Sequence, residues 1–135
     1  MAADEARLPA LVTCSYQRPY VGPGIYAVVT LEVRPRASPG LGWRVALADR
    51  DAPTIAAEVI EPAARGVQAA ITRLGVAAVD VTLVAYRRHE VDSRPAHFAV
   101  AAEWALAVAL ASDEAGARPV GVTVTFEGSR RRAPR

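Results

Sequence analysis

Apolar and polar residues alternate along several short stretches of the chain, a pattern typical of β-strands that bury one face. The stretches that we predict to be strands are 11–16, 25–34, 42–48, 76–86 and 120–126. The second and third stretches flank turn-forming residues at 37–40, so we expect them to pair as a hairpin. In 76–86 the odd-numbered apolar positions from Val79 to Ala85 are expected to share the buried face. In residues 49–61 the apolar positions follow neither the period of a strand nor that of a helix.

Two other stretches place their apolar residues at helical spacing. The first begins at Pro62, because proline suits the first turn of a helix, and Gly75 is expected to end it. The second is longer and alanine-rich and continues to about Ser112. Asp92 and Ser93 have short polar side chains of the kind that cap helices, and they are expected to form its N-cap.

The order of the predicted elements is strand, strand, strand, helix, strand, helix, strand. Two helices packed on one face of a sheet of about four strands form an α+β two-layer sandwich. We expect one domain over residues 10–127, a flexible N-terminus at 1–9 and a basic, flexible tail at 128–135.

The composition excludes several classes of protein. The chain has 135 residues, a net charge of +2 and a single cysteine, Cys14, which cannot form an internal disulfide or a zinc set. No run of about 18 apolar residues is present, and the acidic N-terminus is unlike a signal peptide. These observations predict a folded, cytoplasmic protein without a membrane partner.

All 16 basic residues are arginines, and the chain has neither lysine nor asparagine. Arginine binds phosphates bidentately and stacks on bases, which favours a nucleic-acid partner. GC-rich codon usage accounts for the same bias, and it fits the abundance of alanine as well. Two surplus charges are too few to indicate a polyanion partner. The positions of the arginines, rather than their number, must therefore indicate whether the chain binds nucleic acid.

The motifs of common enzymes and metal sites are incomplete. A glycine-rich loop at 22–24 is followed by a strand, whereas a phosphate-binding loop needs a following helix, so nucleotide hydrolysis is excluded. His89, Glu90 and His97 lack a fourth protein ligand at any recognised metal spacing. We therefore predict no metal and no cofactor.

A hydrolytic triad is a third and more distant interpretation. His89, Asp92 and Ser93 have the residue types, but three near neighbours on one loop rarely reach the relay geometry. No catalytic residue is predicted, and the chain is expected not to be an enzyme.

The junction between the fourth strand and the second helix holds Tyr86, Arg87, Arg88, His89 and Glu90. Arginine, tyrosine and histidine on an exposed connection can pair with phosphates and stack on unpaired bases. A solvated turn is the alternative interpretation, because charged loops are common.

Several motifs along the chain occur in a fixed order. They are G-P-G-I-Y-A-V-V at 22–29, I-E-P-A-A-R-G-V at 60–67, V-D-V-T-L at 79–83, H-E-V-D-S at 89–93 and F-A-V-A-A at 98–102. This series resembles the fourth domain of elongation factor G, in which H-D-V-D-S and A-F-x-x-A-A follow a V-D-V strand at the same spacing. The resemblance covers roughly residues 10–127.

The resemblance implies a fold like that of ribosomal protein S5 domain 2, with a left-handed βαβ crossover. It also implies two tip loops that enter the decoding region of the small ribosomal subunit and contact messenger and transfer RNA. The tip residues implied by matching position are Gly22, Gly24, Tyr26, Arg87, Arg88, His89 and Glu90.

The chain departs from the family pattern in three ways. Pro23 replaces the arginine between the loop glycines, and A-Y-R-R replaces D-G-S-Y before His89, so one basic residue is lost and two are gained. The GTPase domain and the other domains of the factor are missing from this sequence. The expected function is therefore a non-enzymatic, translation-factor-like domain that binds the small ribosomal subunit or another structured RNA.

A module for protein–protein interaction, which kept the fold and lost RNA binding, is the competing hypothesis. The small net charge and Pro23 favour it. Its oligomeric state is open, and dimerisation through an exposed apolar face would support it.

Overall fold

The computed structural model describes residues 8–18, 24–76, 78–89 and 93–127. The strands are β1 (Ala10–Arg18), β2 (Ile25–Pro35), β3 (Gly40–Val45), β4 (Ala78–Arg87) and β5 (Val122–Phe126). The helical segments are α1 (Pro53–Ile55), the π-helical turn η2 (Ala56–Ile60), α2 (Glu61–Leu74), α3 (Pro95–Leu110) and the 3-10 segment η3 (Ser112–Ala117). The predicted order of strands and helices is confirmed.

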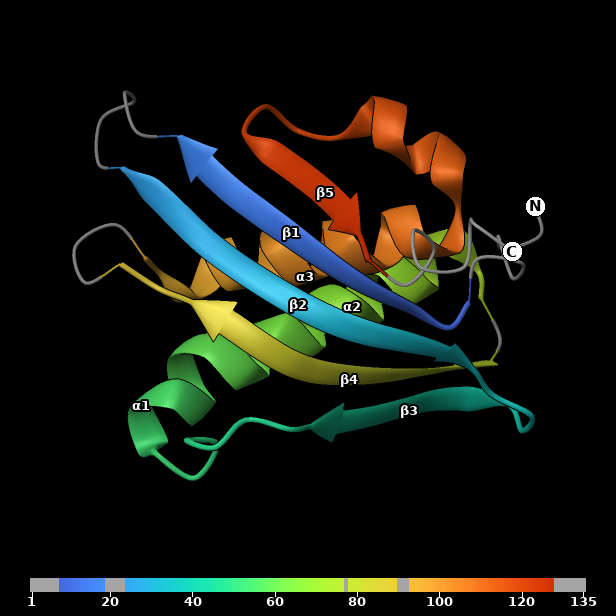
Figure 1. Ribbon diagram of the computed structural model, residues 1–135, viewed down its shortest axis with the longest axis horizontal. Coiled ribbons are helices and arrows are strands. Elements are labelled where there is room, and N and C mark those ends of the chain that lie inside the picture. Colours follow the sequence, from blue (N-terminus) through green and yellow to red (C-terminus); the bar gives the residue numbers. More distant parts are fainter. Residues whose placement is uncertain (1–7, 19–23, 77, 90–92, 128–135) are drawn as a thin grey trace.

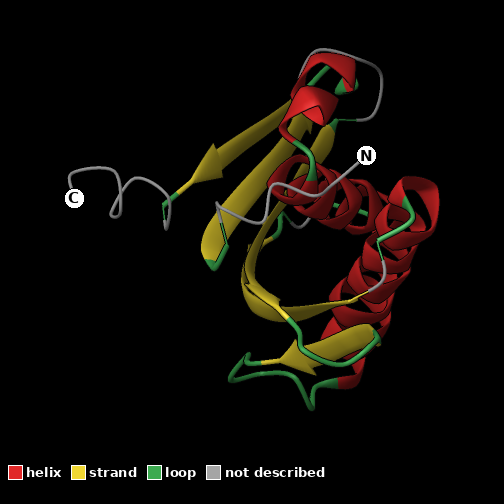
Figure 2. Ribbon diagram, turned by 90° about the vertical axis from the view of Figure 1, so that its right-hand side faces the viewer, coloured by secondary structure: helices red, strands yellow, loops and turns green. Residues whose placement is uncertain are grey.

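The domain has two layers, with the sheet on one side and the helices on the other (Figures 1 and 2). The sheet has five strands, in the order β3-β4-β2-β1-β5, rather than about four. β3 and β4 are parallel, and the other neighbours are antiparallel. The α+β sandwich is therefore confirmed, with a mixed sheet.

The predicted hairpin between the second and third strands is wrong, because β4 lies between β2 and β3. β4 is longer than β3. It pairs with β2 along one edge and with β3 along the other, so that Leu83 lies opposite both Leu31 and Val45. β3 carries two glycines and is only partly buried, which suits an edge position.

The β3–α2–β4 connection is a left-handed crossover. In Figure 1 both strands point the same way, β4 lies above β3, and the helices lie behind the sheet. Nearly all βαβ connections are right-handed, so this handedness is a distinctive feature of the fold.

The segment 49–61, which followed no clear period, contains the start of the first helix. The helical path begins at Pro53 and includes a π turn before it continues as α2. Pro62 explains the turn, because it has no N–H to donate to the carbonyl of Glu58, as an α-helix would require. The helix ends as predicted at Gly75, whose φ of 68° is left-handed.

The core lies between the sheet and α3, with α2 packed beside α3. Helix α3 presents small buried residues to its neighbours, and they are Ala101, Ala102, Ala105, Ala107 and Ala109. At Gly66 of α2 an added Cβ would stand 2.1 Å from the carbonyl oxygen of Ala99. The two helices therefore approach each other closely enough to require glycine at this point.

A β-bulge in β4 reverses the side-chain pattern near the end of that strand. Ala85 lies opposite Thr30 and Leu83 lies opposite Leu31, so Val84 is an extra residue. The prediction that Ala85 shares the buried face is consequently wrong, and Ala85 is exposed. Beyond the bulge, Tyr86 faces the helices, where its ring meets that of Phe98 edge-on at 6.4 Å.

Candidate functional site

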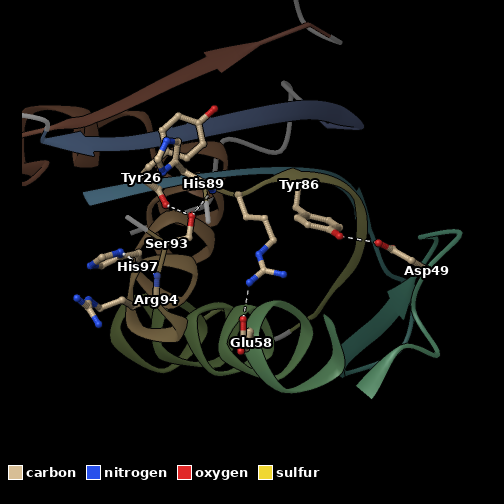
Figure 3. A network of polar contacts seen from close by, with 9 residues as sticks. Tyr26, Asp49, Glu58, Tyr86, His89, Ser93, Arg94 and His97 are labelled. Carbon is tan, nitrogen blue, oxygen red and sulfur yellow. Dashed lines mark hydrogen bonds and ion pairs between the residues drawn. The ribbon is translucent and has the colours of Figure 1, made fainter. Parts of the chain in front are cut away.

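The described residues of the two predicted tip loops lie close together, as Figure 3 shows for Tyr26, His89 and Ser93. The Ser93 hydroxyl donates a hydrogen bond of 2.7 Å to the carbonyl oxygen of Tyr26, and the rings of Tyr26 and His89 lie 6.2 Å apart. One loop precedes β2 and the other follows β4. The tip residues Gly24, Tyr26, Arg87, Arg88 and His89 are described, whereas the predicted positions Gly22 and Glu90 lie outside the described residues.

Ser93 holds the two loops together rather than capping α3. Its hydroxyl also accepts the backbone N–H of His89 at 2.7 Å. The N-cap is Arg94, so the prediction for Ser93 is wrong, and Asp92 lies outside the described residues. The reason is Pro95, because a residue before proline favours extended backbone and proline favours the first helical position. Arg94 donates its backbone N–H to Nδ1 of His97 at 3.2 Å.

The Ser93 contacts bear on the hydrolase interpretation. The single hydroxyl proton of Ser93 is used in the bond to the Tyr26 carbonyl. A serine nucleophile needs that proton to point at a general base. The geometry of Ser93 is therefore that of a structural bridge.

Replacing Ser93 with alanine should destabilise the domain by about 1–2 kcal/mol, because the half-buried Tyr26 carbonyl and the His89 N–H lose their partner. Chemical denaturation measures the loss, and hydrogen exchange should show faster exchange at His89. Ser38→Ala is the matched control, since Ser38 is exposed. Equal stability of the two variants would contradict the bridging role.

Arg87 and Arg88 point to opposite sides of the sheet. Because Tyr86 faces the helices, strand alternation places Arg87 on the open face, where it is exposed and lies opposite Val28. Arg88 turns toward the helical layer and forms an ion pair of 2.7 Å with Glu58 of η2. The two arginines are therefore not equivalent, and Arg87 is the one that the open face presents.

The side chain of Tyr86 makes its contacts within the protein. Its hydroxyl donates a hydrogen bond of 2.5 Å to Oδ2 of Asp49, as Figure 3 shows. Burial raises the pKa of the Tyr86 hydroxyl, and the bond to the Asp49 carboxylate raises it further. The ring and the hydroxyl of Tyr86 are thus both engaged within the protein, whereas the rings of Tyr26 and His89 lie together at the end of the sheet that carries Arg87.

Two further arginines gather at the same end of the molecule. Arg18 ends β1 opposite Ile25, next to Tyr26, and the exposed Arg94 caps α3. Neither arginine was predicted as a site residue, although the Arg94-Pro95 pair was a signal for the helix start. Arg18, Arg87, Arg88 and Arg94 are therefore gathered at this end, and Glu58 neutralises Arg88 among them.

A second tyrosine–histidine pair lies on the helix side of this end. Tyr16 of β1 and His97 of α3 meet edge-on, with ring centroids 5.9 Å apart. The pair joins the start of α3 to the sheet.

Other chemistry has little support in the described part of the chain. No group of three or more His, Cys, Asp or Glu residues that could hold a metal occurs there. Burial raises the pKa of the Cys14 thiol to about 12, so this cysteine is protonated at neutral pH. None of the described helices is long and apolar enough to cross a membrane.

Comparisons with known proteins give similarity of fold. No family model matches the sequence, and no curated protein matches it either. The crystal structure of a protein from Thermus thermophilus is similar with a TM-score of 0.57 and 19% identity, over 85% of this chain. The match covers 16% of the Thermus protein, so this chain spans about a sixth of it. Homoserine kinase from Cytophaga hutchinsonii has a TM-score of 0.46 and 13% identity, over 73% of this chain and 34% of the kinase.

Proposed function

We propose that this domain binds structured RNA, with the small ribosomal subunit as the expected partner, through the end of the sheet where the two loops meet. The observation that carries the proposal is the exposed Arg87, which pairs with Val28 two residues after Tyr26, at the end of the sheet where the rings of Tyr26 and His89 lie 6.2 Å apart. A guanidinium next to aromatic rings can bind a phosphate while unpaired bases stack on the rings. The resemblance of the loop motifs to the fourth domain of elongation factor G supports the ribosome as the source of that RNA.

Contacts among the described residues of this end support the proposal as well. The Ser93 hydroxyl links the start of α3 to Tyr26 of β2, and the bulge in β4 directs Arg87 to the open face. Bulges commonly re-aim side chains next to functional sites. A site whose parts are held in place loses less conformational entropy on binding.

Replacing Arg87 with alanine should weaken binding several-fold, because one phosphate contact is lost. The measurement is fluorescence anisotropy with a labelled RNA hairpin, together with co-sedimentation with small subunits, over a series of salt concentrations. The slope of log affinity against log salt should become shallower by about 0.7–0.9 for one lost contact.

Arg34→Ala is the matched control for Arg87→Ala. Arg34 is exposed and lies toward the other end of the same face of the sheet. It should leave the affinity and the salt slope close to those of the unchanged domain. Equal effects of the two substitutions would overturn the proposed site, and a domain that binds neither the hairpin nor the subunit would overturn the function.

Dimerisation is the second candidate function, and the edge strand β3 favours it. Within the described residues, β3 pairs with β4 along one edge and with no strand along the other. Its Trp43 is only partly buried. Unpaired strand edges can pair with a second chain. Light scattering after size exclusion would show a dimer directly, and Trp43→Arg should then return the monomer.

A further inference from the structure

The ion pair between Arg88 and Glu58 joins the tip to a distant part of the sequence. The guanidinium and the carboxylate lie 2.7 Å apart, and their side chains are 32% and 41% exposed. The carboxylate therefore occupies the position at which a phosphate oxygen would bind Arg88. Arg87, on the other face, has no ion pair among those that the described residues form.

Glu58 owes its position to the π turn that precedes Pro62. The turn places Glu58 in the helical layer within reach of Arg88, the residue that follows β4. π turns are rare, and they often occur at functional sites. A second contact, from Tyr86 to Asp49, ties β4 to the chain just before the helix (Figure 3). Two acidic residues of this one segment thus hold the end of β4.

A phosphate can replace Glu58 as the partner of Arg88. Ion pairs at this exposure are weak, because water screens both charges. A phosphate offers arginine a bidentate partner with more negative charge than a carboxylate. A ligand that brings a phosphate to the helix side of the tip can therefore displace Glu58, whereas a ligand that reaches only the open face leaves the pair intact.

We propose that Glu58 is a specificity-determining residue, which occupies Arg88 in the free domain and yields it to a phosphate backbone that reaches both sides of the tip. This inference rests on the proposed function. A folded RNA presents phosphates on two sides of a protruding tip, and a single phosphate cannot. Glu58 thus lowers the affinity of every ligand that must take Arg88 from it. A folded RNA offsets that cost with its further contacts on the open face, and an isolated anion has no such contacts.

The test compares Glu58→Gln with Glu61→Gln by anisotropy with a labelled RNA hairpin at about 0.1 M salt. Both substitutions remove one negative charge from the same helical segment, but Glu61 forms no ion pair among those that the described residues show. Glu58→Gln should tighten binding about two- to fivefold, which corresponds to the loss of one weak ion pair. Glu61→Gln should change the affinity by much less.

The Arg88→Ala background shows whether Glu58 acts through Arg88. In that background Glu58→Gln should have no effect beyond that of Glu61→Gln. Inorganic phosphate, used as a competitor of the hairpin, should compete better against Glu58→Gln than against the unchanged domain.

The outcomes separate this inference from the proposed function. If the unchanged domain binds the hairpin and Arg87→Ala weakens it, but Glu58→Gln and Glu61→Gln behave alike, the role of Glu58 is wrong and the RNA site stands. Equal tightening by Glu58→Gln with and without Arg88 also overturns the role, since the effect is then one of net charge. No binding by any variant overturns both.

Discussion

Replacing Gly66 with alanine should destabilise the domain by about 3 kcal/mol, although alanine is the better helix former by about 1 kcal/mol. A Cβ at this position would stand 2.1 Å from the Ala99 carbonyl oxygen and 3.0 Å from the Glu103 nitrogen. These are backbone atoms of α3, which cannot rotate away as a flexible side chain can. The helices α2 and α3 must therefore separate, and the alanine-rich contact between them loses its close packing. Urea denaturation followed by circular dichroism measures the change.

Gly116→Ala is the matched control, because a Cβ at Gly116 would have nothing within 4 Å. It should leave the stability within about 0.5 kcal/mol of the original value. If Gly66→Ala were as stable as Gly116→Ala, the close approach of the two helices would not exist as described.

The sequence was sufficient to predict the elements but not their pairing. Alternation along 25–34 and the stop at Gly75 reflect local preferences, and the structure has both. The neighbour of β2 is decided instead by competition between strands. β4 buries Val79, Val81 and Leu83 beside β2, whereas β3 has no fully buried residue to offer. This competition depends on contacts between residues far apart in the sequence. The turn residues at 37–40 carry no information about it, and the predicted hairpin was therefore wrong.

The bulge in β4 is a second feature that could not be predicted from the sequence. Strict alternation places Ala85 and Arg87 on the buried face, and one extra residue moves both to the open face. No residue type in β4 signals the extra residue. The side on which the tip presents Arg87 was therefore beyond prediction from the sequence.

The candidate site was predictable in part for the same reason. The loop motifs led to Tyr26, Arg87, Arg88 and His89, and the structure brings their loops together. The partner of Arg88 lies 30 residues earlier in the sequence, in a stretch with no clear period. Its position depends on the π turn before Pro62, and only the folded chain places it under the tip.

Replacing Phe98 with alanine should destabilise the domain by about 3–5 kcal/mol, the usual range for removing a buried aromatic side chain. Phe98 is 1% exposed and is among the largest fully buried side chains. Since small domains are stable by about 5–15 kcal/mol in total, this loss should bring the midpoint of urea unfolding down strongly.

The expected effect of Phe98→Ala extends to the tip, because the Phe98 ring lies edge-on against Tyr86. Tyr86 precedes both tip arginines, and its bond to Asp49 depends on the position of the ring. The cavity should therefore speed hydrogen exchange at Arg87 and Arg88 more than at the far end of β4. Phe98→Leu, the matched control, fills most of the cavity and should cost less than half as much. Equal losses for leucine and alanine would mean that the ring contact, and not the buried volume, sets the stability. Uniform exchange along β4 would mean instead that Phe98 supports the sheet as a whole, and that the tip does not depend on it in particular.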